Sequence, residues 1–209
     1  MDLLEALNWR YATKRMTGEK VPEEKVQRIL EAIRLTPSSM GLQPYSIIVV
    51  ENRDMLTELQ PIINNQPQIP FASQLLVFAA WTNVTEERID EYLESVHEIR
   101  GTAWEDLKRQ EQRLKKWSAG ETSEKLQRWA EDQAFIALGT AVSAAAMEQV
   151  DATPMGGFNA KALDEYLNLK EKGLHSVVLL TLGYRDEVND YLVKQKKVRR
   201  NKAQLFEVI

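Results

Sequence analysis

Residues 129–150 read WAEDQAFIALGTAVSAAAMEQV, and this stretch decides how the rest of the chain must be arranged. Between Ala134 and Met147 there is no charged side chain and no proline, and alanine, the best helix former, is the commonest residue. The run is too short to span a bilayer, because acidic residues close it at both ends. A helix that is apolar all round must be buried all round. We therefore predict a central core helix, enclosed by the rest of the fold or by a second copy of the chain.

The residues that follow, 151–158, read DATPMGGF and predict an irregular loop, because proline and glycine disfavour regular structure. Gly156 and Gly157 would let the backbone approach a ligand closely, with their N–H groups available as donors. A loop that a buried helix delivers to one place is well suited to hold a ligand. We therefore predict a ligand-binding loop after the central helix.

The order of the remaining elements predicts one α+β domain over residues 1–209. Amphipathic stretches predict helices at about 3–10, 23–36, 54–60 and 159–167. Apolar runs rich in β-branched residues predict buried strands at 46–51, 75–81 and 176–184. A charged helical excursion covers about 85–120 with a break at Gly101, and the chain ends in an apolar, strand-like run at 205–209.

Composition excludes several classes of protein. The net charge of −4 disfavours a nucleic-acid binder. The absence of cysteine excludes disulfides, thiolate metal ligands and cysteine nucleophiles, and is typical of a cytoplasmic setting. The N-terminus lacks the long apolar core of a signal peptide, and no segment predicts a membrane span. We expect a cytoplasmic protein with neither nucleic acid nor membrane as a partner.

The side chains alone offer little chemistry. His97 and His175 are the only histidines, and without cysteine they do not predict a metal site. The chain has no G-x-S-x-G nucleophile elbow, no phosphate-binding P-loop and no G-x-G-x-x-G dinucleotide fingerprint. An enzyme with this sequence would need a bound cofactor for the difficult step.

Two groups of polar residues are each open to two interpretations. The basic group forms either a solvated positive face or a phosphate clamp, in which arginine offers a planar fork and lysine a compact charge. Its members are Arg10, Lys14, Arg15, Lys197 and Arg199. The hydroxyl and amide group either forms turns or binds the edges of a neutral heterocycle, which needs both donors and acceptors. Its members are Ser38, Ser39, Gln43, Asn65 and Gln68.

Five short segments are spread over nearly the whole chain. They are Arg10-Tyr-Ala-Thr-Lys14, Pro37-Ser-Ser with Gln43-Pro44, Asn65-Gln-Pro-Gln68, Pro154-Met-Gly-Gly157 and Lys197-Val-Arg199. In order and spacing they resemble the flavin-binding segments of the FMN-dependent nitroreductase family, especially its oxygen-insensitive NAD(P)H nitroreductases and dihydropteridine reductases. The resemblance implies a mostly antiparallel sheet flanked by helices and an intertwined homodimer. FMN would lie in the subunit interface, and each C-terminal tail would complete the partner's sheet.

The resemblance also implies a role for each residue. Arg10, Lys197 and Arg199 would hold the FMN phosphate, with Tyr11 and Ala12 along the ribityl path. Lys14 would be the catalytic residue, placed at the pyrimidine edge where its charge favours the reduced ring. The flavin ring would be contacted by Asn65, Gln68, Pro154, Met155, Gly156 and Gly157. Pro37, Ser38 and Ser39 would come from the partner subunit, and Gln43 would also belong to the cofactor site. Trp104 and Trp117 of the excursion would cover the substrate pocket.

Two positions depart from the pattern of this family. Many relatives carry glutamate where this chain has Gly156, so the preference for substrate and the flavin potential do not carry over. The backbone N–H survives that change, so flavin binding need not suffer. Gln68 stands where some relatives have lysine, which leaves Lys14 as the main candidate for stabilising reduced flavin.

The implied function is an oxidoreductase with a ping-pong mechanism. It would take hydride from NADH or NADPH and reduce a nitroaromatic, quinone or pterin-type acceptor. Two other classes stay open: a flavin-binding protein without efficient turnover, and an interaction protein whose basic tail binds an acidic partner. Bound flavin, and its anaerobic bleaching by a nicotinamide, would separate the three.

Overall fold

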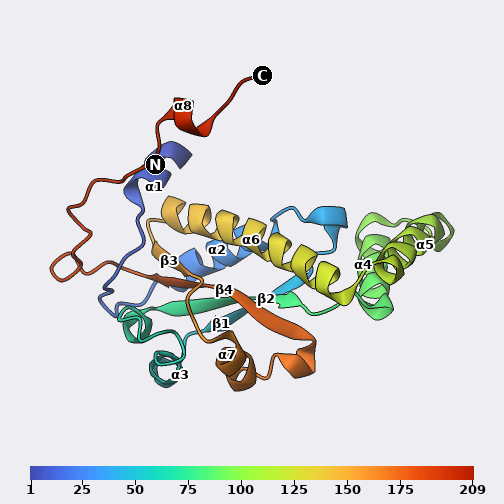
Figure 1. The fold of residues 1–209 in the computed structure, drawn as a ribbon, viewed down its shortest axis with the longest axis horizontal. Coiled ribbons are helices and arrows are strands. Elements are labelled where there is room, and N and C mark those ends of the chain that lie inside the picture. Colours follow the sequence, from blue (N-terminus) through green and yellow to red (C-terminus); the bar gives the residue numbers. More distant parts are fainter.

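A four-stranded sheet forms the middle of the protein, with the long helix α6 (Ser123–Met147) lying across one of its faces (Figure 1). The computed structural model describes all 209 residues. The strands are β1 (Tyr45–Val50), β2 (Gln74–Trp81), β3 (Asp151–Met155) and β4 (Leu174–Gly183). They lie in the order β1-β2-β4-β3, and every neighbouring pair is antiparallel. The expected α+β class with an antiparallel sheet is confirmed.

Helices cover both faces of this sheet. α2 packs with α6 on one face, and α3 and α7 lie on the other (Figure 1). The other helices are α1 (Leu3–Trp9), α2 (Glu23–Arg34), α3 (Arg53–Leu59), α4 (Glu86–Arg100), α5 (Trp104–Gly120), α7 (Ala160–Tyr166) and α8 (Lys202–Leu205). Three short 3₁₀ turns are η1 (Ser39–Gly41), η2 (Ile69–Phe71) and η3 (Lys170–Lys172). None of the helices is long and apolar enough to cross a membrane.

Covering both faces explains why the central strands are apolar without interruption. On β2, Leu76 and Phe78 face α6, whereas Leu75 and Val77 face α3 and α7. β1, predicted as a buried strand, is instead one of the two edge strands of the sheet and is only partly covered. Its apolar composition gave no sign that one side lacks a neighbour within the chain.

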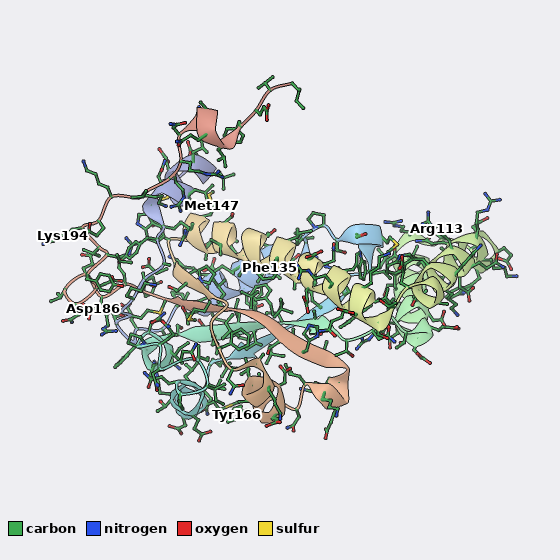
Figure 2. All side chains as sticks on the ribbon, viewed as in Figure 1. Arg113, Phe135, Met147, Tyr166, Asp186 and Lys194 are labelled. Atoms are coloured by element: carbon green, nitrogen blue, oxygen red, sulfur yellow. The ribbon has the colours of Figure 1, made fainter.

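The central helix is enclosed on one face only. Ala134, Ala137 and Ala141 are fully buried against the sheet. On the other face, Phe135 is 51% exposed and Met147 is 43% exposed, and Figure 2 marks both along α6. The sequence allowed the helix to be enclosed by the rest of the fold or by a second copy of the chain. The fold of a single chain covers one face of the helix and leaves the other face exposed.

Residues 151–155 form a strand and not the loop that their composition predicts. β3 pairs with β4 from Asp151 opposite Gly183 to Met155 opposite Leu179. Proline is tolerated here because β3 is an edge strand, where a missing N–H need not break a ladder bond. The prediction from composition gave too much weight to Pro154 and the two glycines, and so it missed the strand.

The C-terminal run is also different from its prediction. Asn201 caps α8 with a reciprocal capping box, in which its side chain accepts from the N–H of Gln204. Leu205 therefore ends a short helix, and Phe206–Ile209 has no regular structure. The tail leads away from the sheet and its apolar side chains are exposed (Figure 1).

The charged excursion is a hairpin of α4 and α5. Gly101 ends α4 in the left-handed conformation with φ 67°, which confirms the predicted break. The hairpin packs on the start of α6 through Leu93, Leu107 and Leu126. It therefore lies at the opposite end of α6 from α1 (Figure 1).

We predict a contrast between Thr153→Val and Thr181→Val, two buried threonines that face each other across β3 and β4. The Thr153 hydroxyl donates to the Thr13 carbonyl at 2.9 Å and lies 2.9 Å from the Thr13 hydroxyl. Its loss leaves buried polar atoms unpaired and should lower the free energy of unfolding by about 1–3 kcal/mol. The Thr181 hydroxyl has no partner, so its removal should be neutral or stabilising. Urea unfolding of both variants measures this, and equal losses would contradict it.

A basic pocket between the first helix and the C-terminal tail

The segment after α1 is fixed to the sheet and to the loop after β4. Thr13 is fully buried and bonded to Thr153 on β3. Asp190, only 4% exposed, accepts from the Tyr11 hydroxyl at 3.1 Å and from the Lys14 N–H at 2.7 Å. Segment 10–15, which carries several of the predicted site residues, is therefore held from both sides.

This segment and the C-terminal tail enclose a cavity of about 450 Å³. Five residues predicted to hold a phosphate and its linker line it: Arg10, Tyr11, Ala12, Lys197 and Arg199. The rest of its lining is Asn8, Trp9, Arg185, Leu192, Val193, Gln195 and Lys196. The structure thus brings together two groups of predicted residues from opposite ends of the chain. We call this cavity the basic pocket.

Positive charge is concentrated in the basic pocket, and Arg10, Lys197 and Arg199 form no ion pair with a carboxylate. Burial lowers the pKa of Lys197 from its ordinary value, and the charges of Arg10 and Arg199 lower it further. Burial, then Arg199, also lowers the pKa of Arg10, whose Nε is buried without a partner. The Lys197 ammonium donates to the main-chain carbonyls of Leu7 and Arg10, at the carboxyl end of α1. An anion in this pocket would relieve the repulsion, and phosphate suits the donors present.

Arg185, which the sequence did not single out, forms part of the wall of the basic pocket. It makes an ion pair with Asp151, Nη2 to Oδ1, at 2.6 Å. Its guanidinium also lies 4.2 Å from the ring centre of Trp9 and 4.7 Å from that of Tyr11. The only signal in the sequence is a basic residue just after the strand 176–184, and that signal names no partner.

A second group of predicted residues meets at the far end of β3. Gln68 is fully buried, and its Nε2 contacts the Met155 sulfur at 3.6 Å. Its Oε1 has no hydrogen-bond partner. Asn64 donates to the Gly157 carbonyl at 2.9 Å, and the exposed Asn65 beside it has a left-handed φ of 52°. β3 thus begins at Asp151, whose partner Arg185 lines the basic pocket, and ends at Met155, which contacts Gln68 with its unpaired amide oxygen.

The other predicted site residues lie away from the basic pocket of the same chain. Ser39 is not part of the basic pocket lining, and its N–H donates to Gln133 of α6 at 2.8 Å. Gln43 donates from its N–H to the Ser38 hydroxyl at 2.9 Å, in the same loop as Pro37. Trp104 stacks on His97 and Trp117 packs edge-on against Trp129, in each case at 5.0 Å. These residues can reach a basic pocket only if it belongs to another copy of the chain.

A larger cavity of about 690 Å³ lies beside the edge strand β1. Its walls come from α2, β1 and α4, and its lining is mainly apolar, including Leu30, Ile47 and Val49. Gln43 is at its rim. We call it the edge cavity.

Comparison with known proteins identifies relatives of this chain. The model of the nitroreductase family matches residues 7–184. A Staphylococcus haemolyticus protein is 32% identical over 206 residues, covering 92% of this chain and 93% of that protein. A Bacillus subtilis protein is 31% identical over 195 residues, covering 88% of each chain. Both are named, provisionally, as NAD(P)H nitroreductases.

A solved structure from Exiguobacterium sibiricum shares the fold. It superposes with a TM-score of 0.87 at 18% identity and covers 100% of this chain and 98% of its own. That structure is described as a nitroreductase, again provisionally named, in complex with FMN.

We predict that the protein takes up protons when it binds a phosphate monoester at alkaline pH. The pKa of Lys197 is lowered in the free pocket, and a neighbouring dianion would raise it again. Between these two pKa values the free lysine is partly neutral and the bound lysine is charged. Below the lowered pKa it is charged in both states and contributes no uptake. Calorimetry in buffers of different ionisation enthalpy measures the protons, and Lys197→Arg, which stays charged, is the control. Equal uptake by both proteins would contradict the prediction.

Proposed function

Because this chain belongs to the nitroreductase family, we propose that it is an FMN-dependent oxidoreductase that uses NADH or NADPH to reduce a nitroaromatic, quinone or pterin-type acceptor. The observation that carries this proposal is the basic pocket. None of its three predicted phosphate ligands, Arg10, Lys197 and Arg199, has a carboxylate within ion-pair distance, although the protein forms such pairs elsewhere. Their charge is therefore available to a bound anion.

The polar atoms of the site fit FMN at both ends. The basic pocket suits a terminal phosphate, since arginine and lysine supply charged donors. At the other end of β3, the unsatisfied Oε1 of the buried Gln68 is an acceptor that a flavin N–H would satisfy. A buried amide without a partner otherwise costs free energy. The chain also lacks a dinucleotide fingerprint, which favours FMN over FAD.

When bound, FMN would supply the redox chemistry, accepting hydride from the nicotinamide and passing electrons to the acceptor in a ping-pong cycle. Lys14 would supply a fixed positive charge beside it. The Asp190 carboxylate holds the Lys14 main chain, and the Lys14 ammonium makes no ion pair. A preorganised charge of this kind favours the state of the site that carries more negative charge.

We also propose that the working unit is a homodimer. The outer face of α6 leaves Phe135 and Ile136 about half exposed, and the tail exposes Phe206 and Ile209. The edge cavity beside β1 is apolar and adjoins a strand with no neighbour on that side. A partner's tail lying in the edge cavity would bury the apolar side chains of the tail and cover the open side of β1. The same arrangement would bring the partner's Pro37–Ser39 loop, and an α4–α5 hairpin with Trp104 and Trp117, to each basic pocket.

We predict that the purified protein carries FMN and that NADH or NADPH bleaches it without oxygen. The Lys14→Ala variant should keep FMN but be reduced about 100-fold more slowly, as when one preorganised donor is lost from an active site. Lys161→Ala, an exposed lysine on α7, is the matched control and should behave like the original. Mass spectrometry identifies the flavin and stopped-flow absorbance gives the rates. Flavin that neither nicotinamide reduces would indicate a binding protein without turnover. FAD as the main flavin would contradict the assignment of the pocket.

Deleting residues 205–209 should dissociate the dimer and release FMN together. The deleted side chains are the exposed apolar ones that a partner would bury, and obligate dimers rarely keep a stable monomer. Light scattering and flavin absorbance follow the two events on one sample. Lys202→Ala, in the same tail but polar, is the control and should leave both unchanged. A truncated monomer that stays folded and yellow would refute the shared site.

A further inference from the structure

We propose that Asp151 and Arg185 are positioning residues that hold the Trp9–Ala12 wall of the basic pocket in its phosphate-binding shape. This inference rests on the proposed function, because it concerns how the same site recognises the phosphate of its cofactor. Neither residue belongs to the five segments that carry the family resemblance. The pair is defined here by its own contacts.

The carboxylate of the ion pair is buried, and the Arg185 side chain is only 16% exposed. Asp151 is 2% exposed and stands at the first position of β3, four residues after α6 ends at Met147. Both of its oxygens are used by Arg185: Oδ1 accepts from Nη2 at 2.6 Å, and Oδ2 accepts from the main-chain N–H at 2.9 Å. The Nε of Arg185 lies 2.9 Å from Oδ1 and 3.0 Å from Oδ2. The carboxylate of Asp151, at the start of β3, therefore fixes the orientation of the guanidinium.

The oriented guanidinium in turn supports the pocket wall. Its carbon lies 4.2 Å from the ring centre of Trp9 and 4.7 Å from that of Tyr11, distances typical of a cation–π contact. Arg10, between them, has extended backbone with φ −70° and ψ 144°. Trp9 and Tyr11, the neighbours of Arg10 on either side, are thus both held against the Arg185 guanidinium. With both neighbours held, the backbone that carries the Arg10 side chain into the lining of the basic pocket is fixed.

Charge alone does not explain the pair. The Asp151 carboxylate raises the pKa of Arg10, and the Arg185 guanidinium lowers it. Because the two charges are opposite in sign and lie side by side, their effects on Arg10 oppose each other. The net positive charge of the pocket comes from Arg10, Lys196, Lys197 and Arg199, and the Asp151–Arg185 pair contributes orientation.

The sign of one mutational effect separates positioning from charge. Asp151→Asn removes a negative charge close to Arg10, so an electrostatic role alone would make phosphate bind more tightly. Positioning requires the opposite. We expect the Kd for FMN to rise about tenfold, in the range of couplings between contacting residues. The Kd for riboflavin, which keeps the ribityl chain beside Tyr11 and Ala12 but has no phosphate for Arg10 to bind, should rise by a clearly smaller factor, about twofold, since its ring contacts lie at the far end of β3. Fluorescence quenching of each flavin by flavin-free full-length protein gives both constants.

A second variant guards against misfolding of the first. Arg185→Lys keeps the charge beside Asp151 but loses the planar fork and the stacking on two rings. It should lose FMN affinity by a similar factor and keep most of its riboflavin affinity. Arg113→Lys on α5, an exposed arginine at the far end of the molecule, is the matched control (Figure 2). Tighter FMN binding by Asp151→Asn, or equal FMN binding by Arg185→Lys and Arg113→Lys, would overturn the inference. So would a parallel loss of both flavins.

Inorganic phosphate separates failure of this inference from failure of the proposed function. If the unaltered protein binds neither flavin, the proposed function fails, and the inference is then judged by phosphate alone. Added phosphate should raise the melting temperature of the original protein and of Arg113→Lys, but less that of Arg185→Lys. Equal stabilisation of all three proteins, or none, would overturn the positioning role.

Discussion

The close packing of α6 on the sheet is the contact on which the rest of the structure depends. Alanines at 134, 137, 141 and 145 form the buried stripe, so the helix contributes only small side chains to its contact with β2 and β4, whose Leu76, Phe78 and Leu180 fill the space between. A close-packed interface of this kind cannot shift without opening voids. α6 therefore acts as a rigid rod of 25 residues, about 37 Å long. One end carries the α4–α5 hairpin and the other delivers Asp151 to the basic pocket.

The basic pocket is assembled at some electrostatic cost to the folded chain. Lys197 and Arg10 are partly buried beside each other and beside Arg199, and burial lowers the pKa of both. Hydrogen bonds offset part of that cost: Lys197 donates to main-chain carbonyls at the end of α1, and Asp190 binds the main chain of segment 10–15. The remaining repulsion is available to favour an anion, which links the stability of the chain to occupation of the pocket.

The sequence was informative wherever a local pattern determines the outcome. Helical periodicity predicts the apolar stripe of residues 26–33, which appears in α2. Capping chemistry predicts the cap at Asn159, which appears at the start of α7. β3 was missed because Pro154 is tolerated only through its place at the sheet edge, which is a property of the tertiary fold. The grouping of Arg10 with Lys197 and Arg199 came from resemblance, since no local rule links residues so far apart. The Asp151–Arg185 pair, between residues 34 apart, has no sequence signature at all.

The two edges of the sheet differ in a way that limits how copies of the chain can assemble. At the β3 edge, Pro154 has no N–H to offer, so a further strand finds an incomplete ladder there. At the β1 edge the ladder is open, with Ser46 and Val49 exposed. Growth of the sheet from one chain to the next needs two receptive edges, and this protein has one. The position of one imino acid thus works against open-ended addition of strands and favours assembly that closes after a single step.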